Sequence, residues 1–222
     1  MVLDADSLLS VDRLCFCVQK LDLGRNTLVM ELANKTAFIT GGASGLGLAT
    51  ARNFVAAGAN VFLYDLNAEA LAASASEFGN NVKWQAGDVA DEAAVKSAVA
   101  SAIDHFGTIH INVNSAGIGG AARTVGKNGP MPLEKFEHIV RVNLVGTFNV
   151  LRLCAEVMQT NEPQTEDQER GVIINVASIA AFDGQTGQAG YAASKGGIVA
   201  MTLPIARDLA KRGVRIMTIA PG

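Results

Sequence analysis

The segment Thr40-Gly41-Gly42-Ala43-Ser44-Gly45-Leu46-Gly47 decides the fold of this chain. It follows a short apolar run, residues 35–40, and leads into an Ala-rich segment of helical period. Glycine lets the backbone turn sharply and lets a pyrophosphate approach the first N–H groups of a helix, where the helix dipole favours anions. A strand, a glycine turn and a helix in this order predict a dinucleotide-binding unit, with an ordinary tight turn as the alternative.

Short β-rich runs alternate with longer helical segments from Lys35 onward, which is typical of stacked βαβ units. The near-continuous apolar character of the runs indicates strands that are covered on both faces. We therefore predict an α/β fold with a doubly wound parallel (Rossmann) sheet in the order 3-2-1-4-5-6. The expected strands are residues 35–40, 60–65, 82–86, 109–114, 171–177 and 214–220, and the expected helices are 45–57, 68–78, 91–106, 133–159 and 191–211.

The two ends of the chain do not follow this alternation. Residues 1–33 are expected to form an unassigned N-terminal leader, followed by one domain over residues 34–222. The leader carries too many acids for a mitochondrial transit peptide. Residues 216–222 read as a buried strand that runs into a turn, so the domain is expected to be C-terminally incomplete, with its final strand missing.

The composition excludes several classes of function. The 18 Lys and Arg residues against 21 Asp and Glu residues give a formal charge of −3, which offers no overall attraction to nucleic acids or anionic membranes. We therefore expect no autonomous nucleic-acid binding and no membrane association. Cys15, Cys17 and Cys154 lack the spacing of a metal site or a disulfide framework, and no metal is expected.

Polar residues follow the carboxyl ends of the first four expected strands, which meet at one edge of the sheet. Asp65 ends the second strand, where its carboxylate can accept hydrogen bonds from an adenosine ribose and repel a 2′-phosphate. Neither Leu66 nor Asn67 supplies a cation, so NAD is favoured over NADP. A helix N-cap is the alternative role of Asp65. Asp88-Val89 and the segment 114–117 mark the same crevice, although Asp88 alone is also a common turn residue.

A Tyr-x-x-x-Lys pair marks the expected last helix. Tyr191 and Lys195 lie four residues apart and therefore on one helical face. A nearby ammonium favours phenolate, which makes Tyr191 a usable acid or base, whereas an amphipathic pair at a helix start is the alternative. Ser178, after the fifth strand, can donate to a substrate oxygen, and Asn143 lies in the preceding helix. Ser194, within the motif, is expected to have no partner of its own.

Other polar residues are weaker candidates. Gln185 and Gln188 lie between Ser178 and Tyr191, where they line the substrate side or form a solvated loop. No catalytic role is expected for the histidines, which lack a carboxylate or nucleophile at a suggestive spacing: His105, His110 and His138.

Taken in order, these motifs resemble the short-chain dehydrogenase/reductase superfamily. The matching positions are Thr40-Gly41 with Gly45 and Gly47, residues 114–117, Asn143, Ser178, Tyr191 with Lys195, and Pro221-Gly222. More narrowly, GGASGLGLAT, VNLVGTFNVLRL and GQAGYAASKGGIVAMTLPIARDLA are similar to the type-2 3-hydroxyacyl-CoA dehydrogenases, also called type-10 17β-hydroxysteroid dehydrogenases. The resemblance extends from residue 33 to the end of the chain.

The resemblance implies roles for individual residues. Tyr191 becomes the proton donor or acceptor and Lys195 its activator and ribose contact, Ser178 stabilises the substrate oxygen, and Asn143 anchors a water molecule of a proton relay. Substrate contacts are expected at Ser178, Gln185 and Gln188. Ser115 stands where the family usually has Asn or Cys. The implied cofactor-binding residues are Gly41, Ser44, Gly45, Leu46, Gly47, Asp65, Asp88, Val89, Ser115, Tyr191 and Lys195.

The resemblance also implies an NAD-dependent oxidoreductase that interconverts secondary alcohols and ketones. The expected substrates are 3-hydroxyacyl-CoA thioesters, with hydroxysteroids as a further class. A homotetramer in mitochondria is implied, with the cytoplasm as the alternative because the leader is a poor transit peptide. A second hypothesis is a catalytically impaired NAD-binding scaffold, such as a subunit of a mitochondrial tRNA-processing complex.

Overall fold

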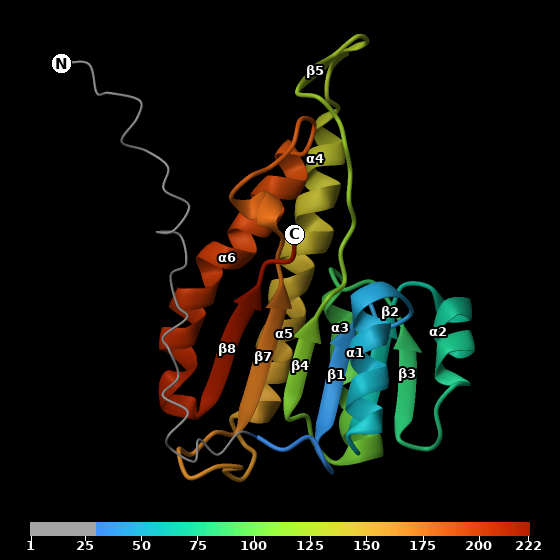
Figure 1. Ribbon diagram of the computed structural model, residues 1–222, viewed down its shortest axis with the longest axis vertical. Coiled ribbons are helices and arrows are strands. Elements are labelled where there is room, and N and C mark those ends of the chain that lie inside the picture. The colour runs from blue at the N-terminus through green and yellow to red at the C-terminus, as the bar shows by residue number, and fades with distance from the viewer. Residues whose placement is uncertain (1–29) are drawn as a thin grey trace, which may run out of the picture.

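The computed structural model describes residues 30–222 and is built around a six-stranded parallel sheet (Figure 1). Its strand order, β3-β2-β1-β4-β7-β8, confirms the predicted doubly wound topology. The expectations for residues 1–29, including those for Cys15 and Cys17, lie outside the described residues. The strands of this sheet are β1 (Thr36–Thr40), β2 (Asn60–Asp65), β3 (Val82–Ala86), β4 (Ile111–Asn114), β7 (Gly171–Val176) and β8 (Val214–Ile219).

Helices cover both faces of the sheet and bury two separate cores. The first core lies under α3, α5 and α6 and includes Phe38 and Ile173 from the strands. The second lies under α1 and α2 and includes Ile39 and Val113, and Met30 also packs there. None of the helices within residues 30–222 has the length and apolar character needed to cross a membrane. The helix bounds are α1 (Gly45–Ala56), α2 (Ala68–Ala75), α3 (Glu92–Phe106), α4 (Leu133–Val140), α5 (Gly146–Met158) and α6 (Ala189–Leu209).

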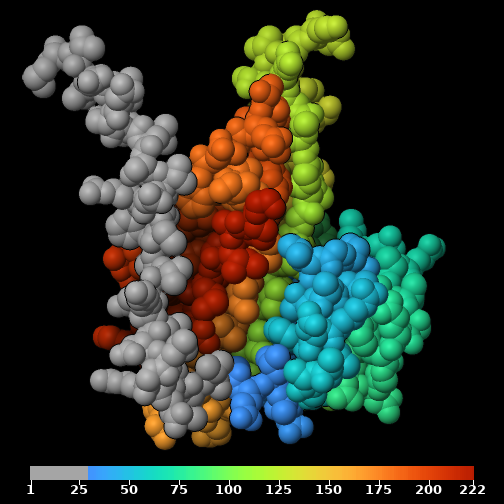
Figure 2. Space-filling model, in the orientation of Figure 1, coloured from blue at the N-terminus to red at the C-terminus, as the bar shows by residue number. Residues whose placement is uncertain are grey.

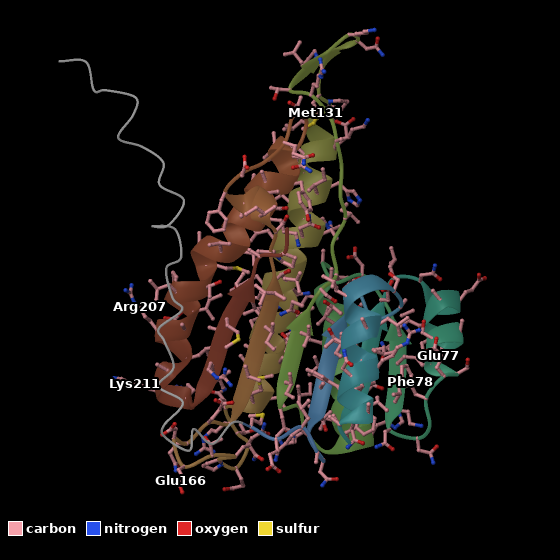
Figure 3. The ribbon with its side chains drawn as sticks, in the orientation of Figure 1. Glu77, Phe78, Met131, Glu166, Arg207 and Lys211 are labelled. Carbon is pink, nitrogen blue, oxygen red and sulfur yellow. The ribbon has the colours of Figure 1, made fainter. Side chains whose placement is uncertain are left out.

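Several charged side chains lie at the periphery of this layered structure. The labelled residues Glu77, Glu166, Arg207 and Lys211 are exposed and lie at its outer and lower margins, away from the carboxyl ends of the strands (Figure 3).

The expected helix over residues 133–159 is wrong in one respect, because a π-helical turn divides it. Arg141–Val145 forms this turn between α4 and α5. Directly after it, a Cβ atom on Gly146 would lie 2.5 Å from Val89 Cγ2, so the helix passes very close to the loop after β3. The turn adds one residue to a helical repeat without interrupting the apolar pattern, and periodicity therefore does not register it.

The sequence pattern also missed a small antiparallel hairpin, made of β5 (Val125–Gly126) and β6 (Gly129–Pro130). The hairpin projects beyond the carboxyl edge of the sheet, at the top of Figure 1. Strands of two residues that contain Gly and Pro carry no alternation of polar and apolar residues, so the usual strand signal is absent.

A row of buried amides links β4 to β7 inside the first core. Asn114 Nδ2 donates to Asn112 Oδ1 at 2.7 Å and to Asn175 Oδ1 at 2.9 Å. Asn112 Nδ2 in turn donates to the carbonyl oxygen of Phe38 on β1, at 3.2 Å. All three asparagines are at most 2% exposed. The amides therefore join three central strands through side chains as well as backbone.

Candidate active site

Two adjoining hollows lie at the carboxyl edge of the sheet and form one groove. The first, of about 440 Å³, runs over the glycine turn and the ends of β2 and β3. The second, of about 510 Å³, contains Ser178, Tyr191 and Lys195. Leu46, Ser115, Gly117 and Ile118 line both hollows. In Figure 2 the blue segment around residue 45 and the red C-terminal residues meet near the middle of the visible face of the molecule.

The structure brings the sequence-predicted cofactor residues together along this groove. Tyr191 and Lys195 line the second hollow. The other nine residues line the first: Gly41, Ser44, Gly45, Leu46, Gly47, Asp65, Asp88, Val89 and Ser115.

The glycine turn leaves no space for side chains at two of its positions. A Cβ atom on Gly47 would overlap the carbonyl oxygen of Gly41 and lie 2.7 Å from Ser115 Oγ. Gly41 has φ +66°, and a Cβ there would lie 2.9 Å from the backbone nitrogen of Ala116. Gly41 and Gly47 are thus required because other backbone segments pass too close for a side chain, as in a phosphate-binding turn.

The N-terminus of α1 differs from those of α2 and α3. Asn67 and Asp91 cap α2 and α3 with side-chain oxygens, and each of those helices has an acid in its first turn. Ser44 makes no side-chain cap at α1, whose first turn contains no acid. The first N–H groups of α1 therefore remain available to an anion in the groove.

Asp65 connects β2 to the glycine turn. Its Oδ2 atom accepts a hydrogen bond from the backbone N–H of Ala43 at 3.2 Å, and Oδ1 accepts one from Asn67 at 3.2 Å. Asn67 caps α2, so the N-cap role considered for Asp65 is taken by its neighbour. The carboxylate of Asp65 both holds the turn and faces the first hollow.

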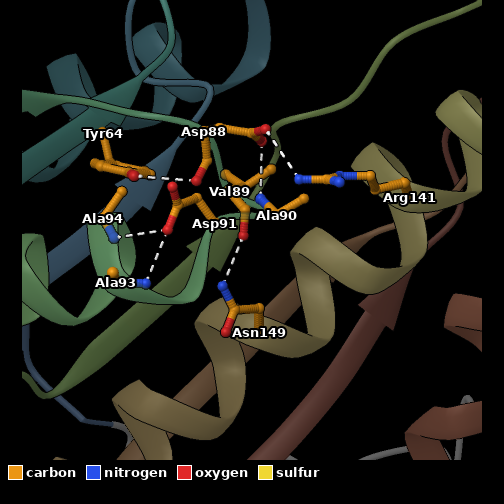
Figure 4. Close-up of polar contacts among 9 residues, drawn as sticks. All are labelled: Tyr64, Asp88, Val89, Ala90, Asp91, Ala93, Ala94, Arg141 and Asn149. Carbon is orange, nitrogen blue, oxygen red and sulfur yellow. Dashed lines mark hydrogen bonds and ion pairs between the residues drawn. The ribbon is translucent and has the colours of Figure 1, made fainter.

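The loop after β3 is held from two sides (Figure 4). Tyr64 Oη donates to the carbonyl oxygen of Asp88 at 3.2 Å, and Asn149 Nδ2 donates to that of Val89 at 2.9 Å. The Asp88 carboxylate accepts from the Ala90 N–H at 2.8 Å and lies 3.8 Å from Arg141. Burial raises the pKa of Tyr64 to about 12, so its hydroxyl remains a donor at neutral pH.

Lys195 is buried and points to the end of β7. Its Nζ atom donates to the carbonyl oxygen of Val176 at 2.7 Å and lies 5.7 Å from the centroid of the Tyr191 ring. Burial lowers the pKa of Lys195 to about 8, because the charged form loses solvation. The lysine still carries its proton at neutral pH and places a positive charge beside Tyr191.

Asn143 lies behind the loop after β4 rather than on the wall of the groove. Its Oδ1 atom accepts from the Ile118 N–H at 2.8 Å, and Nδ2 donates to the Ile118 carbonyl oxygen at 3.0 Å. Nδ2 also donates to Ser194 Oγ at 3.0 Å. The expectation that Ser194 has no partner is therefore wrong, because the fold brings Asn143 to it from 51 residues away.

The remaining predicted residues divide between the groove and its rim. Ser178 and Gln188 line the second hollow. Gln185 is exposed and does not line it, but its backbone N–H donates to Gln188 Oε1 at 2.9 Å. Pro221 also lines the hollow, and its carbonyl oxygen accepts from the Ile179 N–H at 2.8 Å.

Sequence reasoning missed the residues that support the site from behind, namely Tyr64, Arg141, Asn149 and Ser194. Asn149 had a visible signal, since a polar residue on the buried face of an apolar helix needs a partner. The partner itself cannot be read from the chain, because 60 residues separate Asn149 from Val89.

A family model described as short chain dehydrogenase matches residues 35–222, which contain the glycine turn and the Tyr191–Lys195 pair. The chain is a short-chain dehydrogenase. It is 55% identical over 188 residues to human 3-hydroxyacyl-CoA dehydrogenase type-2, an alignment that covers 84% of this chain and 72% of the relative. The protein of the same name from Drosophila melanogaster is 49% identical, covering 86% and 75% of the two chains.

A solved structure agrees with this assignment. The crystal structure of 3-hydroxyacyl-CoA dehydrogenase type-2 from Mycobacterium avium has a TM-score of 0.81 and 38% identity, covering 87% of this short-chain dehydrogenase and 77% of that chain. The protein is thus an oxidoreductase enzyme that acts on small molecules, and its family and Rossmann fold usually use NAD(P).

Proposed function

We propose that this short-chain dehydrogenase uses NAD to interconvert 3-hydroxyacyl-CoA and 3-oxoacyl-CoA. The observation that carries the proposal is the continuous groove that joins Asp65 and the glycine turn to Tyr191 and Lys195. Such a groove suits an extended dinucleotide whose reactive ring ends beside a proton donor.

NAD fits the residues of the first hollow. The close approach of Gly41 and Gly47 leaves room for a pyrophosphate above the uncapped start of α1. Within the described part of the chain, the first hollow has neither Lys nor Arg among its lining residues, and Asp65 would repel a 2′-phosphate. These features favour NAD over NADP.

The proposed roles follow from the positions of the side chains. Tyr191 takes the proton of the substrate hydroxyl during oxidation and returns it during reduction. Lys195 places its positive charge 5.7 Å from the centroid of the Tyr191 ring, and Ser178 donates a hydrogen bond to the substrate oxygen. NAD, when bound, accepts the hydride from the carbinol carbon.

The substrate class rests on the relatives. Proteins that are 55% and 49% identical to this chain are named for 3-hydroxyacyl-CoA. We therefore propose thioesters as the main substrates and hydroxysteroids as a second class. Gln188 is the polar residue proposed to contact the substrate beside Ser178, with Gln185 supporting it.

The test is NADH formation by the purified protein with a short-chain 3-hydroxyacyl-CoA. We expect turnover with NAD to exceed that with NADP in kcat/KM by at least about 100-fold, given charge repulsion at Asp65. Replacing Tyr191 with Phe removes the acid–base group and should lower kcat about 1000-fold. Unaltered turnover in Tyr191→Phe would sink the mechanism, and NADH binding without any wild-type turnover would favour the scaffold hypothesis.

The similarity to 3-hydroxyacyl-CoA dehydrogenases also leads us to propose a homotetramer located in mitochondria. Light scattering of the purified protein tests the first proposal, and the location of a fluorescent fusion in cells tests the second. A monomer, or a cytoplasmic fusion, would reject the respective proposal.

A further inference from the structure

Ser194 is fully buried and its hydroxyl connects two residues of the proposed active site. The hydroxyl donates to the backbone carbonyl oxygen of Tyr191 at 2.7 Å and accepts a hydrogen bond from Asn143 Nδ2 at 3.0 Å. Because its single proton is directed to Tyr191, Ser194 offers only an acceptor to Asn143. This contact therefore decides which end of the Asn143 amide faces α6.

The other contacts of Asn143 depend on the same orientation. The Ile118 N–H donates to Oδ1 at 2.8 Å, and Nδ2 donates to the Ile118 carbonyl oxygen at 3.0 Å. Turning the amide over would set Oδ1 against the two oxygens to which Nδ2 now donates, and would set Nδ2 against the Ile118 N–H. Both hydrogens of the amide are used, one on Ile118 and one on Ser194.

The loop held by Asn143 also borders Lys195. A Cβ atom on Gly117 would lie 3.1 Å from Asn143 Oδ1 and 3.5 Å from Lys195 Nζ. The loop thus borders both side chains at Gly117, the residue directly before Ile118. A change in the Asn143 amide would move the loop that borders the Lys195 ammonium.

We propose that Ser194 is a positioning residue for the reaction at Tyr191, acting by fixing the Asn143 amide and, through it, the loop Gly117–Ile118 beside Lys195. The proposal rests on the proposed dehydrogenase function. Ser194 directly precedes Lys195 and, unlike Tyr191 and Lys195, does not line the groove.

The first test uses steady-state kinetics of Ser194→Ala. We expect kcat to fall about 10-fold, because small displacements of reacting groups are costly, while KM for NAD stays within about 2-fold. Thr202→Val is the matched control: Thr202 also lies on α6, its hydroxyl donates to the backbone carbonyl oxygen of Ile198 at 2.8 Å and lies 2.6 Å from Thr218 Oγ1 on β8, and neither threonine lines the groove. The control should keep wild-type kcat; an unchanged kcat in Ser194→Ala overturns the proposal.

A double-mutant cycle asks whether Ser194 acts through Asn143. In the Asn143→Ala background, Ser194→Ala should lower kcat by less than about 2-fold, because the amide that it positions is gone. Independent, multiplicative losses would overturn the proposed route. Ser194→Cys keeps the side chain small but substitutes a weak acceptor, so it should show the same defect if Ser194→Ala does not fold.

A readout without turnover separates this proposal from the proposed function. Hydrogen exchange of the Ile118 amide, which donates to Asn143 Oδ1, should be at least about 10-fold faster in Ser194→Ala and unchanged in Thr202→Val. A wild-type protein without turnover would reject the dehydrogenase function, and exchange would still decide whether Ser194 holds the loop. Equal exchange in wild type and Ser194→Ala overturns the positioning role.

Discussion

At the scale of single residues, Gly47 is a position in the groove where an added side chain would collide with the backbone. The space that a side chain would need is occupied by the backbone of Gly41 and by Ser115 Oγ. Ser115 Oγ also donates to the carbonyl oxygen of Thr40, so the turn after β1 and the loop after β4 are locked together at this point. Neither segment can withdraw without breaking this contact.

Gly47→Ala is therefore expected to weaken NADH binding at least about 10-fold, because overpacking forces backbone shifts at the proposed pyrophosphate site. Titration calorimetry with NADH measures the effect. Gly79→Ala is the control, since a Cβ on Gly79 meets open space. Equal affinities for the two variants would contradict this account of the turn.

Individual site residues could be predicted from the sequence where their position depends only on local structure. Asp65 and Lys195 were found because a strand end and a helical spacing of four place them without knowledge of the rest of the chain. Ser194 was not found, because its partner lies on another helix and sequence spacing carries no information on that contact.

At the scale of elements, His110 joins β1 to β4 at the edge opposite the groove. The Nδ1 atom of His110 accepts from the Thr36 N–H at 3.1 Å, and the backbone N–H of His110 donates to the Thr36 carbonyl oxygen at 2.9 Å. Burial, with a smaller effect of Lys35, lowers the pKa of His110 from 6.5 to about 4. The structure thus gives this histidine a packing role, as expected, and favours its neutral form.

The pH dependence of stability follows from this shift. Between about pH 6.5 and 4 the unfolded chain binds the proton more tightly than the folded chain, so the contribution of His110 is complete above 6.5 and is lost as pH falls toward 4. His110→Asn keeps an acceptor near Thr36 and should reduce this loss in urea titrations. The exposed His105→Asn serves as the control; identical pH profiles for His110→Asn and wild type would refute the assignment.

The contact between α5 and the loop after β3 makes a second prediction at this scale. Asn149→Ala removes the donor to Val89 and should raise KM for NAD about 10-fold while leaving kcat within about 2-fold, because the loop borders only the first hollow. Asn53→Ala on the exposed side of α1 is the matched control. A loss confined to kcat would argue against a role in holding the cofactor.

The order and type of the large elements were predictable, whereas their local irregularities were not. Apolar runs and glycine turns identify each strand of the main sheet, although β4 begins two residues later than expected, at Ile111. The π-helical turn depends on the close passage of Gly146 past Val89, which is a tertiary contact. Local sequence therefore gives the helix but not its interruption.

At the scale of the whole molecule, the groove needs both halves of the sheet. The glycine turn and Asp65 come from the first half, whereas Tyr191 and Pro221 come from the second. The loop after β4, at the centre of the sheet, lines both hollows. A cofactor bound along the groove would contact segments more than 140 residues apart, as the positions of Gly47 and Tyr191 show.

Saturating NADH should therefore stabilise the whole protein, by about 2.7 kcal/mol at a free concentration 100 times Kd. Calorimetric melting measures this gain. Hydrogen exchange should slow both in residues 41–47 and in residues 115–118. Protection restricted to one of these segments would show that NADH does not occupy the continuous groove.

The buried amides of β4 and β7 have a consequence for assembly of the sheet. Parallel strands built from similar apolar residues can align in more than one way, and a shift by one residue exchanges the two faces of a strand. Such a shift would carry Asn175 away from Asn114 and leave buried amides unpaired, at about 1–3 kcal/mol for each. We therefore expect the asparagines to disfavour shifted alignments of β4 and β7 during folding, and so to favour the one that sets Ser178 in one hollow with Tyr191 and Lys195.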